Sequence, residues 1–297
     1  MSCQDSGDLN RNSRDRPRVA ILGVPGRESV QKELQRIRPA IEERAEIVVE
    51  DLEFQYDFSD TDIDLVIVLG GDGSILQSAR QMGVNQIPVL GINCGRLGFL
   101  AALSPDDFLC VWADVCCGQF AVAEHVMLKT QLVRDGKVQA EQLALNEAAV
   151  LGGPPYEILD IDLYADGELA TRYRCDGLIL ATPVGSTAHN LSAGGPILRR
   201  TLQAVVISPI SPHTLTYRPV VDSADTRFEL QVVKPNDSTS IVVDGRMLGQ
   251  LRSDDLVRIE RADTTFKMVS VAGNNDYRSL REKLGWGGSV SMPRTRT

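Results

Sequence analysis

The first 120 residues alternate between two hydrophobic periodicities. Glu28 to Arg44 is rich in charge, with apolar residues three or four positions apart, which predicts an amphipathic helix with its buried face at Val30, Leu34, Ile37 and Ile41. A second helix is predicted from Ser74 to Met82. Short apolar runs predict buried strands at residues 18–22, 45–49, 64–69 and 87–92. This alternation predicts an α/β domain with a parallel sheet, in which ligands bind beyond the carboxyl ends of the strands.

From about Ala121 onward, apolar and polar residues alternate with a period of two. The dipeptides Asp135-Gly136 and Asp166-Gly167 lie between such segments and predict β-hairpins. We therefore predict a second, mostly antiparallel β domain, followed by a helix from Tyr277 to Leu284. The predicted divisions are a disordered leader at 1–16, an α/β domain at 17–120, a nucleotide-binding β domain at 121–270 and a C-terminal segment at 271–297.

The composition and charge of the chain argue against several classes of function. The chain has 297 residues, 43% hydrophobic and 24% charged, which is ordinary for a globular protein. Its formal net charge of -9 argues against nucleic-acid binding through a basic face. No apolar run is long enough for a membrane span and no signal-peptide core is present, so we expect no membrane association and a cytoplasmic location. The six cysteines form no CxxC pair, which favours unpaired thiols over a zinc site.

Four polar, glycine-rich segments carry the candidate chemistry. They contain neither the P-loop pattern GxxxxGK[ST] nor a GxGxxG after the first strand, so neither common nucleotide-binding mechanism is assumed. The segments are GGDGS at residues 70–74, NCGRLGFL at 93–100, NE at 146–147 and the stretch from Asp176 to Pro196, which includes TPVGSTAHNLSAGGP.

Together these segments resemble the NAD kinase family over about Arg18 to Gly287. GGDG alone occurs in several kinases, whereas its combination with LNE and DGLILATPVGSTAHNLSAGGP is specific. The resemblance implies the two-domain NAD kinase fold, with the last helix returning to the first domain and the active site where the glycine turn meets the β domain. It also implies phosphorylation of the 2′-hydroxyl of the adenosine ribose of NAD to give NADP, with ATP or another phosphoryl donor, a divalent metal such as Mg²⁺, and assembly into a dimer or tetramer.

The resemblance also assigns roles to individual residues. Asp72 is the expected catalytic residue, which orients the ribose hydroxyl and accepts its proton, while Gly71 and Gly73 let the backbone approach the phosphates. Positioning should matter more than basicity, because deprotonation of the hydroxyl can be late in phosphoryl transfer. The expected substrate-binding residues are Asn146, Glu147, Arg174, Asp176, Thr187, Ala188, His189, Asn190, Leu191, Ser192, Asp244 and Arg246.

Some of these positions allow a plainer interpretation. Arg174 reads equally well as a surface cation, and Asp244-Gly245 as a type I′ turn. Ser186 or a neighbour is the predicted N-cap of a short helix that starts at Thr187. Three residues depart from the family pattern: Val184 replaces a threonine, His189 a tyrosine and Arg246 a glutamine or other polar residue.

Two other functions are consistent with parts of the sequence. A lipid kinase would share the GGDG turn, but no apolar lid for an acyl chain is evident. A nucleotide-binding sensor without turnover would retain the fold, and only His189 and Val184 favour it. An assay with diacylglycerol in place of NAD separates the first alternative, and NAD binding without turnover would identify the second.

Overall fold

The computed structural model describes residues 16–24, 26, 28–95, 98–101, 103–271 and 276–285, so residues 1–15 of the predicted leader lie outside the described residues. The chain divides into two compact units. The first contains residues 1–78, 87–122 and 269–297, and the second contains residues 79–86 and 123–268. The domain boundaries that we expect from the sequence stay predictions.

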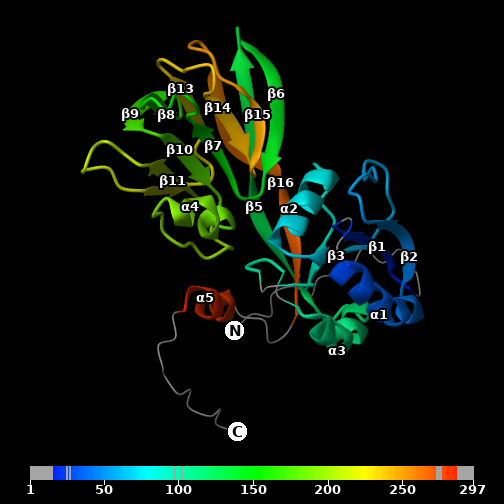
Figure 1. Cartoon of the computed structure of the whole chain (residues 1–297). Helices are drawn as coiled ribbons and strands as arrows, with labels where there is room; N and C mark the ends of the chain where they lie inside the picture. The colour runs from blue at the N-terminus through cyan, green and yellow to red at the C-terminus, as the bar shows by residue number, and fades with distance from the viewer. Residues whose placement is uncertain are drawn as a thin grey trace. The chain divides into compact units, whose positions relative to one another are not determined.

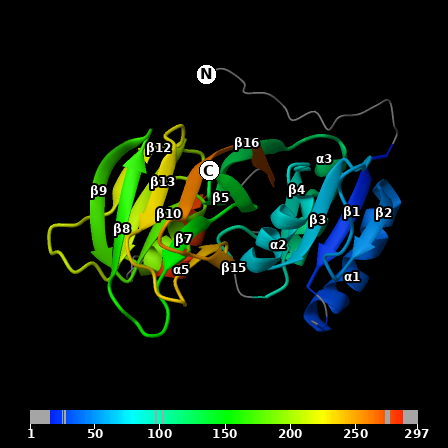
Figure 2. The same cartoon turned by 90° about the horizontal axis from the view of Figure 1, so that it is seen from above.

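The first unit contains a parallel sheet with the strand order β2-β1-β3-β4 (Figures 1 and 2). Every residue of β3 and β4 is buried, as expected for parallel strands that are covered on both faces. The predicted α/β architecture is confirmed. The strands are β1 (Arg18–Gly23), β2 (Glu46–Asp51), β3 (Leu65–Gly70) and β4 (Val89–Asn93).

Three helices follow strands of this sheet. They are α1 (Glu28–Arg44), α2 (Asp72–Met82) and α3 (Pro105–Cys116). In α1 the four predicted apolar positions are all buried, which confirms the helix and its face. The sequence reasoning missed α3, whose Trp112 Nε1 donates a 2.9 Å hydrogen bond to the carbonyl of Ala40 in α1.

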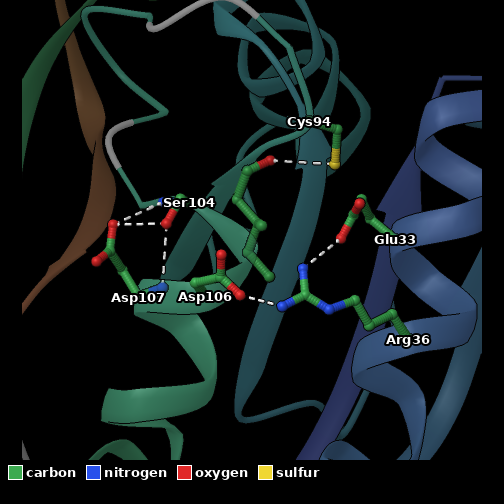
Figure 3. A network of polar contacts seen from close by, with 7 residues as sticks. Glu33, Arg36, Cys94, Ser104, Asp106 and Asp107 are labelled. Atoms are coloured by element: carbon green, nitrogen blue, oxygen red, sulfur yellow. Dashed lines mark hydrogen bonds and ion pairs between the residues drawn. The ribbon is translucent and has the colours of Figure 1, made fainter.

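Polar contacts explain how α3 begins and how it is held against α1 (Figure 3). Ser104 and Asp107 form a capping box, in which the Ser104 hydroxyl accepts from the Asp107 N–H at 3.1 Å and the Asp107 carboxylate accepts from the Ser104 N–H at 3.2 Å. Arg36 of α1 pairs with Glu33 at 3.2 Å and with Asp106 in the first turn of α3. The Ser-x-x-Asp pattern after Leu103 was therefore an available signal for this helix.

The second unit is built mainly from two antiparallel sheets (Figure 2). In one sheet β16, β13, β8 and β9 are neighbours in that order, and β5 pairs with β16 and β6. The other has the order β12-β11-β10-β7-β14-β15. Both sheets contribute to one core, which includes Val150, Leu180 and Ile161. The strands of the first sheet are β5 (Ala121–Arg134), β6 (Lys137–Ala144), β8 (Leu159–Ala165), β9 (Glu168–Cys175), β13 (Phe228–Val232) and β16 (Leu256–Ser270). Those of the second are β7 (Glu147–Leu151), β10 (Gly177–Ala181), β11 (Ala204–Ile210), β12 (Val220–Ser223), β14 (Ser240–Val243) and β15 (Arg246–Gln250).

The predicted hairpin turns are present. Asp135-Gly136 joins β5 to β6, and Asp166-Gly167 joins β8 to β9. All four residues have positive φ, between 50° and 87°, as a type I′ turn requires. The mostly antiparallel second domain and its hairpins are thereby confirmed.

Three remaining expectations concern the chain as a whole. The predicted C-terminal helix is present as α5 (Asp276–Leu284), which belongs to the first unit. None of the helices in the described residues is both long and apolar enough to span a bilayer. The five described cysteines form no disulfide, and burial raises the pKa of the Cys94 and Cys175 thiols to about 11.

Replacing Ser104 by Ala should weaken the start of α3. The substitution removes the side-chain acceptor of the capping box and should lower the free energy of unfolding by about 1 kcal/mol. Urea unfolding followed by circular dichroism measures the change. Ser29→Ala, at an exposed position in α1, is the matched control and should be neutral or slightly stabilising, because alanine favours helix. Equal losses in both variants would contradict the capping role.

Candidate active site

In the first unit, the glycine turn lies where β3 ends and α2 begins. Gly70 has φ of 151°, and a Cβ there would lie 2.0 Å from the Ser74 hydroxyl oxygen, so this position requires glycine. Gly71 and Gly73 differ, because a Cβ at either would meet nothing within 4 Å. Asp72 is the first residue of α2 rather than part of a loop, so the helix starts two residues before the predicted Ser74.

The Asp72 carboxylate is held by the loop that follows β4. Its Oδ2 accepts from the Phe99 N–H at 2.8 Å, and its Oδ1 accepts from the N–H groups of Leu100 and Ala101 at 2.8 and 3.3 Å. The loop passes so close that a Cβ at Gly98 would lie 2.0 Å from Oδ1. Contacts within the chain alone therefore fix the orientation of Asp72.

In the second unit, the Asp244 carboxylate likewise accepts three backbone hydrogen bonds, here from the chain around Asn146 and Glu147. The Asp244 carboxylate accepts from the N–H groups of Leu145, Asn146 and Glu147 at 2.8, 2.8 and 3.0 Å. Asp244 and Gly245 have φ of 44° and 74°, so they also form the expected type I′ turn, between β14 and β15. Asp244 is thus both a turn residue and the anchor of the Asn146-Glu147 bend.

Glu147 is the electrostatically unusual group of this unit. Only 7% of the residue is exposed, and its Oε2 accepts no hydrogen bond from the described part of the chain. Burial, followed by repulsion from Asp244, raises the pKa of Glu147 to about 7, although the His189 N–H donates to the carboxylate. Burial also raises the pKa of Asp244, against the three N–H donors and the charge of Arg80. Two neighbouring carboxyl groups therefore both disfavour ionisation.

The segment after β10 packs directly on the Asn146 backbone. A Cβ at Gly185 would lie 2.1 Å from the Asn146 carbonyl oxygen, so only glycine permits this contact. The Thr182 hydroxyl donates to the Leu145 carbonyl at 2.6 Å and accepts from the Gly185 N–H at 3.0 Å. The predicted nucleotide-binding segment and the Asn146-Glu147 bend thus form one assembly.

The predicted Ser186 N-cap is wrong. Residues Gly185–Thr187 form a 3₁₀ turn (η1), and α4 (His189–Ser192) follows with Ala188 at its N-cap and no side-chain cap. The Ser186 hydroxyl instead donates to the Pro183 carbonyl at 2.6 Å and accepts from the Leu198 N–H at 3.0 Å. It closes the loop that follows α4 and is fully buried.

Asn190 is engaged in the same way, whereas its neighbours are accessible. Its Nδ2 donates to the carbonyls of Ser186 and Pro196, each at 3.0 Å, and its Oδ1 accepts from the Ser208 hydroxyl at 2.7 Å. The residue has 0% exposure. The other five predicted residues of this segment are partly or fully exposed, namely Thr187, Ala188, His189, Leu191 and Ser192.

Arg174 and Asp176 lie apart from this group. Glu147 pairs with Ala181 at the end of β10, whereas Asp176 precedes the start of the same strand. Five strand residues separate the two ends by roughly 17 Å. Arg174 pairs there with Asp160 at 3.2 Å, and Asp176 lies 3.8 Å from His213 Nε2. The structure therefore brings Asn146, Glu147, the 187–192 segment and Asp244 together, and separates Arg174 and Asp176 from them.

Arg80 was not among the predicted residues. It belongs to the part of α2 that falls in the second unit, and its guanidinium donates to the Asp244 carbonyl at 3.2 Å. Burial, followed by the nearby charge of Arg246, lowers its pKa. Two cations thus adjoin the Asp244 turn. No local sequence signal identifies Arg80, because its position depends on tertiary packing.

The comparisons with known proteins agree with this organisation. Residues 20–120 match the model of the ATP-NAD kinase N-terminal domain, and residues 145–271 match that of the ATP-NAD kinase C-terminal domain. An NAD kinase of Rhodopirellula baltica is 69% identical over 276 residues, which cover 93% of this chain and 89% of that protein. The chain belongs to the NAD kinase family. An NAD kinase of Cellvibrio japonicus is 41% identical and covers 77% of both chains.

The solved structures of an NADH kinase and an NAD kinase share the fold. A yeast NADH kinase complexed with NADH superimposes with a TM-score of 0.82 at 24% identity, covering 95% of this chain and 91% of that chain. An NAD kinase from Archaeoglobus fulgidus in complex with ATP gives a TM-score of 0.69 at 27% identity, with 92% and 100% covered. The predicted family and its two-domain fold class, an α/β domain with an antiparallel β domain, are therefore confirmed.

Replacing Glu147 by Gln should change how stability depends on pH. The folded-state pKa of about 7 lies above the ordinary value of 4.5, so the folded protein retains a proton that the unfolded chain releases as pH rises between these values. The stabilisation that protonated Glu147 contributes is fully present below about pH 4.5 and is lost as the pH rises through about 7. Relative to wild type, Glu147→Gln should gain up to roughly 3 kcal/mol at pH 8 and nothing at pH 4.

Thermal unfolding from pH 4 to pH 8 measures this difference in the absence of nucleotide. Glu168→Gln, at an exposed position at the start of β9, is the control and should show no difference that varies with pH. A constant offset between wild type and Glu147→Gln would contradict the raised pKa.

Proposed function

We propose that this chain transfers the terminal phosphoryl group of ATP to the 2′-hydroxyl of the adenosine ribose of NAD, giving NADP. The family match and the 69% identical NAD kinase support this activity and do not favour a lipid kinase or a silent sensor. The observation within this chain that carries the mechanism is the Asp72 carboxylate, held at the start of α2 by three backbone N–H groups.

Asp72 acts mainly by orienting the attacking hydroxyl. An ionised carboxylate has about four acceptor positions, and three N–H groups occupy most of them. A carboxylate held in this way is a well-directed partner for one further donor. This suits phosphoryl transfer, in which positioning and charge stabilisation dominate and the nucleophile is deprotonated late.

Gly71 and Gly73 leave the start of α2 open to phosphate. The chain around them has room for a side chain and imposes no left-handed backbone at either position. The unpaired N–H groups of a helix N-terminus attract anions, and a missing Cβ permits closer approach. We assign these two glycines to the phosphates of ATP.

The second unit supplies the dinucleotide-binding residues. Glu147 Oε2, which accepts no hydrogen bond from the described residues, offers an acceptor for a ribose hydroxyl, and the accessible Thr187, Ala188, His189, Leu191 and Ser192 offer surface for the rest of NAD. Asn146, Asn190 and Asp244 shape this surface through backbone and loop contacts. Arg246, next to Arg80, offers positive charge to a phosphate. Contacts of NAD with Arg174 and Asp176 stay predictions.

On this proposal, a divalent metal such as Mg²⁺ would be bound together with ATP rather than by a protein site of its own. The described residues contain no group of three His, Cys, Asp or Glu side chains placed to hold a metal. The Asp72 carboxylate already accepts hydrogen bonds from three N–H groups and lies 3.6 Å from the ammonium nitrogen of Lys283. It is therefore poorly suited to coordinate a further cation. The described residues would therefore leave the metal to oxygen ligands of ATP, which is a type of ligand that Mg²⁺ prefers. The metal would neutralise the phosphate charge that develops during transfer.

The cellular setting is also a proposal. We place the protein in the cytoplasm, where NAD and ATP are its partners and where cysteines stay reduced. A dimer or tetramer is expected by family resemblance, and neither nucleic acid nor membrane is expected as a partner. Light scattering of the purified chain tests the assembly.

Asp72→Asn should abolish most activity without unfolding the protein. The amide cannot accept a proton, and its NH₂ group faces an N–H group of the loop, so we expect a rate loss of about 10²–10⁴-fold and a stability loss of about 1–3 kcal/mol. Mass spectrometry of NADP formed from NAD and ATP measures the rate, and thermal unfolding checks the fold. Asp60→Asn, at an exposed position of the same unit, should behave as wild type. Full activity of a folded Asp72→Asn protein would remove Asp72 from the mechanism.

Gly73→Ala should make the protein more stable and less active. Alanine is favoured over glycine in a helix by up to about 1 kcal/mol, and a Cβ here meets nothing in the chain. The same methyl group should obstruct the phosphates and raise KM for ATP about tenfold or more. Gly71→Ala, which precedes the helix, should lose activity without the gain in stability. Wild-type kinetics in Gly73→Ala would show that the phosphates do not approach this backbone.

A further inference from the structure

A cation from the far end of the chain faces the Asp72 carboxylate. Lys283 lies in the last turn of α5, and its Nζ is 3.6 Å from Asp72 Oδ2. The same ammonium lies 4.0 Å from the centroid of the Phe99 ring, in the loop whose N–H group donates to that oxygen. Two contacts therefore fix the end of a side chain that is otherwise flexible.

The contact between Lys283 and Asp72 places a positive charge where the glycine turn carries an unfavourable negative one. The start of α2 and the small residues beside it suit an anion, yet the turn presents a carboxylate, which repels phosphate. The segment Gly70–Ser74 contains no lysine or arginine of its own. An ammonium against Asp72 cancels the local charge that an incoming triphosphate would meet.

We propose that Lys283 is a positioning residue for phosphoryl transfer, which offsets the charge of Asp72 and holds its Oδ2 toward the loop. The triphosphate can then approach the turn, while Asp72 keeps its orientation toward the acceptor hydroxyl. This inference rests on the kinase activity proposed above and assigns α5 a part in it.

A purely structural role makes different predictions. The side chains of Lys283 and Asp72 are 27% and 31% exposed, and ion pairs at such positions contribute little to stability. Loss of the ammonium should therefore leave the fold nearly intact and act through charge. An anchor for α5 alone would instead alter thermal stability and leave nucleotide affinity unchanged.

The first experiment compares steady-state kinetics of Lys283→Met, Lys283→Arg and Arg281→Met. Arg281 is an exposed cation two residues earlier in α5, and its substitution is the matched control for loss of one positive charge. We expect KM for ATP to rise about tenfold in Lys283→Met, to return to within about threefold in Lys283→Arg and to stay within about twofold in Arg281→Met. KM for NAD should not change, and the defect should shrink in Lys283→Arg because the charge is restored.

A binding experiment separates charge compensation from a structural effect. Calorimetric titration with a non-hydrolysable ATP analogue should show affinity lost in Lys283→Met and recovered in the double variant Asp72→Asn/Lys283→Met, because the repelling carboxylate is then also absent. Should Lys283→Met not fold, Lys283→Gln takes its place in both measurements.

Three outcomes would overturn the inference. They are an unchanged KM for ATP in Lys283→Met, an equal rise in Arg281→Met, or no recovery of affinity in the double variant. Wild-type protein provides the separate test of the function itself. An inactive wild type would reject the kinase proposal, whereas an active wild type beside an unaltered Lys283→Met would reject the role of Lys283 alone.

Discussion

The glycine turn of the first unit is held by one carboxylate that accepts three backbone hydrogen bonds. Asp72 joins the end of β3 and the start of α2 to the loop at residues 98–101. Because the loop passes against Oδ1, Gly98 has no room for a side chain. The same contacts therefore fix both the direction of the Asp72 carboxylate and the path of the loop. A change at Asp72 would alter the loop as well as the proposed chemistry, which is why activity and stability must be measured together.

The second unit also contains a carboxylate that accepts three backbone hydrogen bonds, but its role is structural. Asp244 also follows a strand, precedes a glycine and accepts hydrogen bonds from three backbone N–H groups. Asp244 is partly exposed as a residue, but burial of its carboxyl group raises its pKa, so it serves as an internal tie for the Asn146-Glu147 bend. The Asp72 side chain is 31% exposed and faces an ammonium group. Similar sequence, Asp-Gly after an apolar strand, thus gives one scaffold carboxylate and one that is available to a ligand.

Local patterns predicted those parts of the chain whose structure is decided locally. The face of α1 follows from the spacing of Val30, Leu34, Ile37 and Ile41, and the hairpins follow from Asp-Gly pairs with positive φ. Ser186 was wrongly predicted as an N-cap because its hydroxyl has partners at Pro183 and Leu198, the second of which is distant in sequence. Arg80 and Lys283 could not be found at all, since each matters only through a residue more than 150 positions away. The candidate residues were thus recognisable as segments, whereas the division between ligand-facing and supporting side chains required the structure.

The glycines of these segments are required for different reasons, although they belong to the same motifs. At Gly70 and Gly185 a Cβ would collide with atoms of the chain itself, so the fold alone requires glycine there. At Gly71 and Gly73 nothing in the chain lies within 4 Å of that position, and Gly73 even weakens the helix that it occupies. A residue that costs stability and fills no structural need is best explained by a partner outside the chain. The phosphates of ATP, which we propose to lie at the start of α2 beside a carboxylate paired with Lys283, would be a partner of the required size and charge.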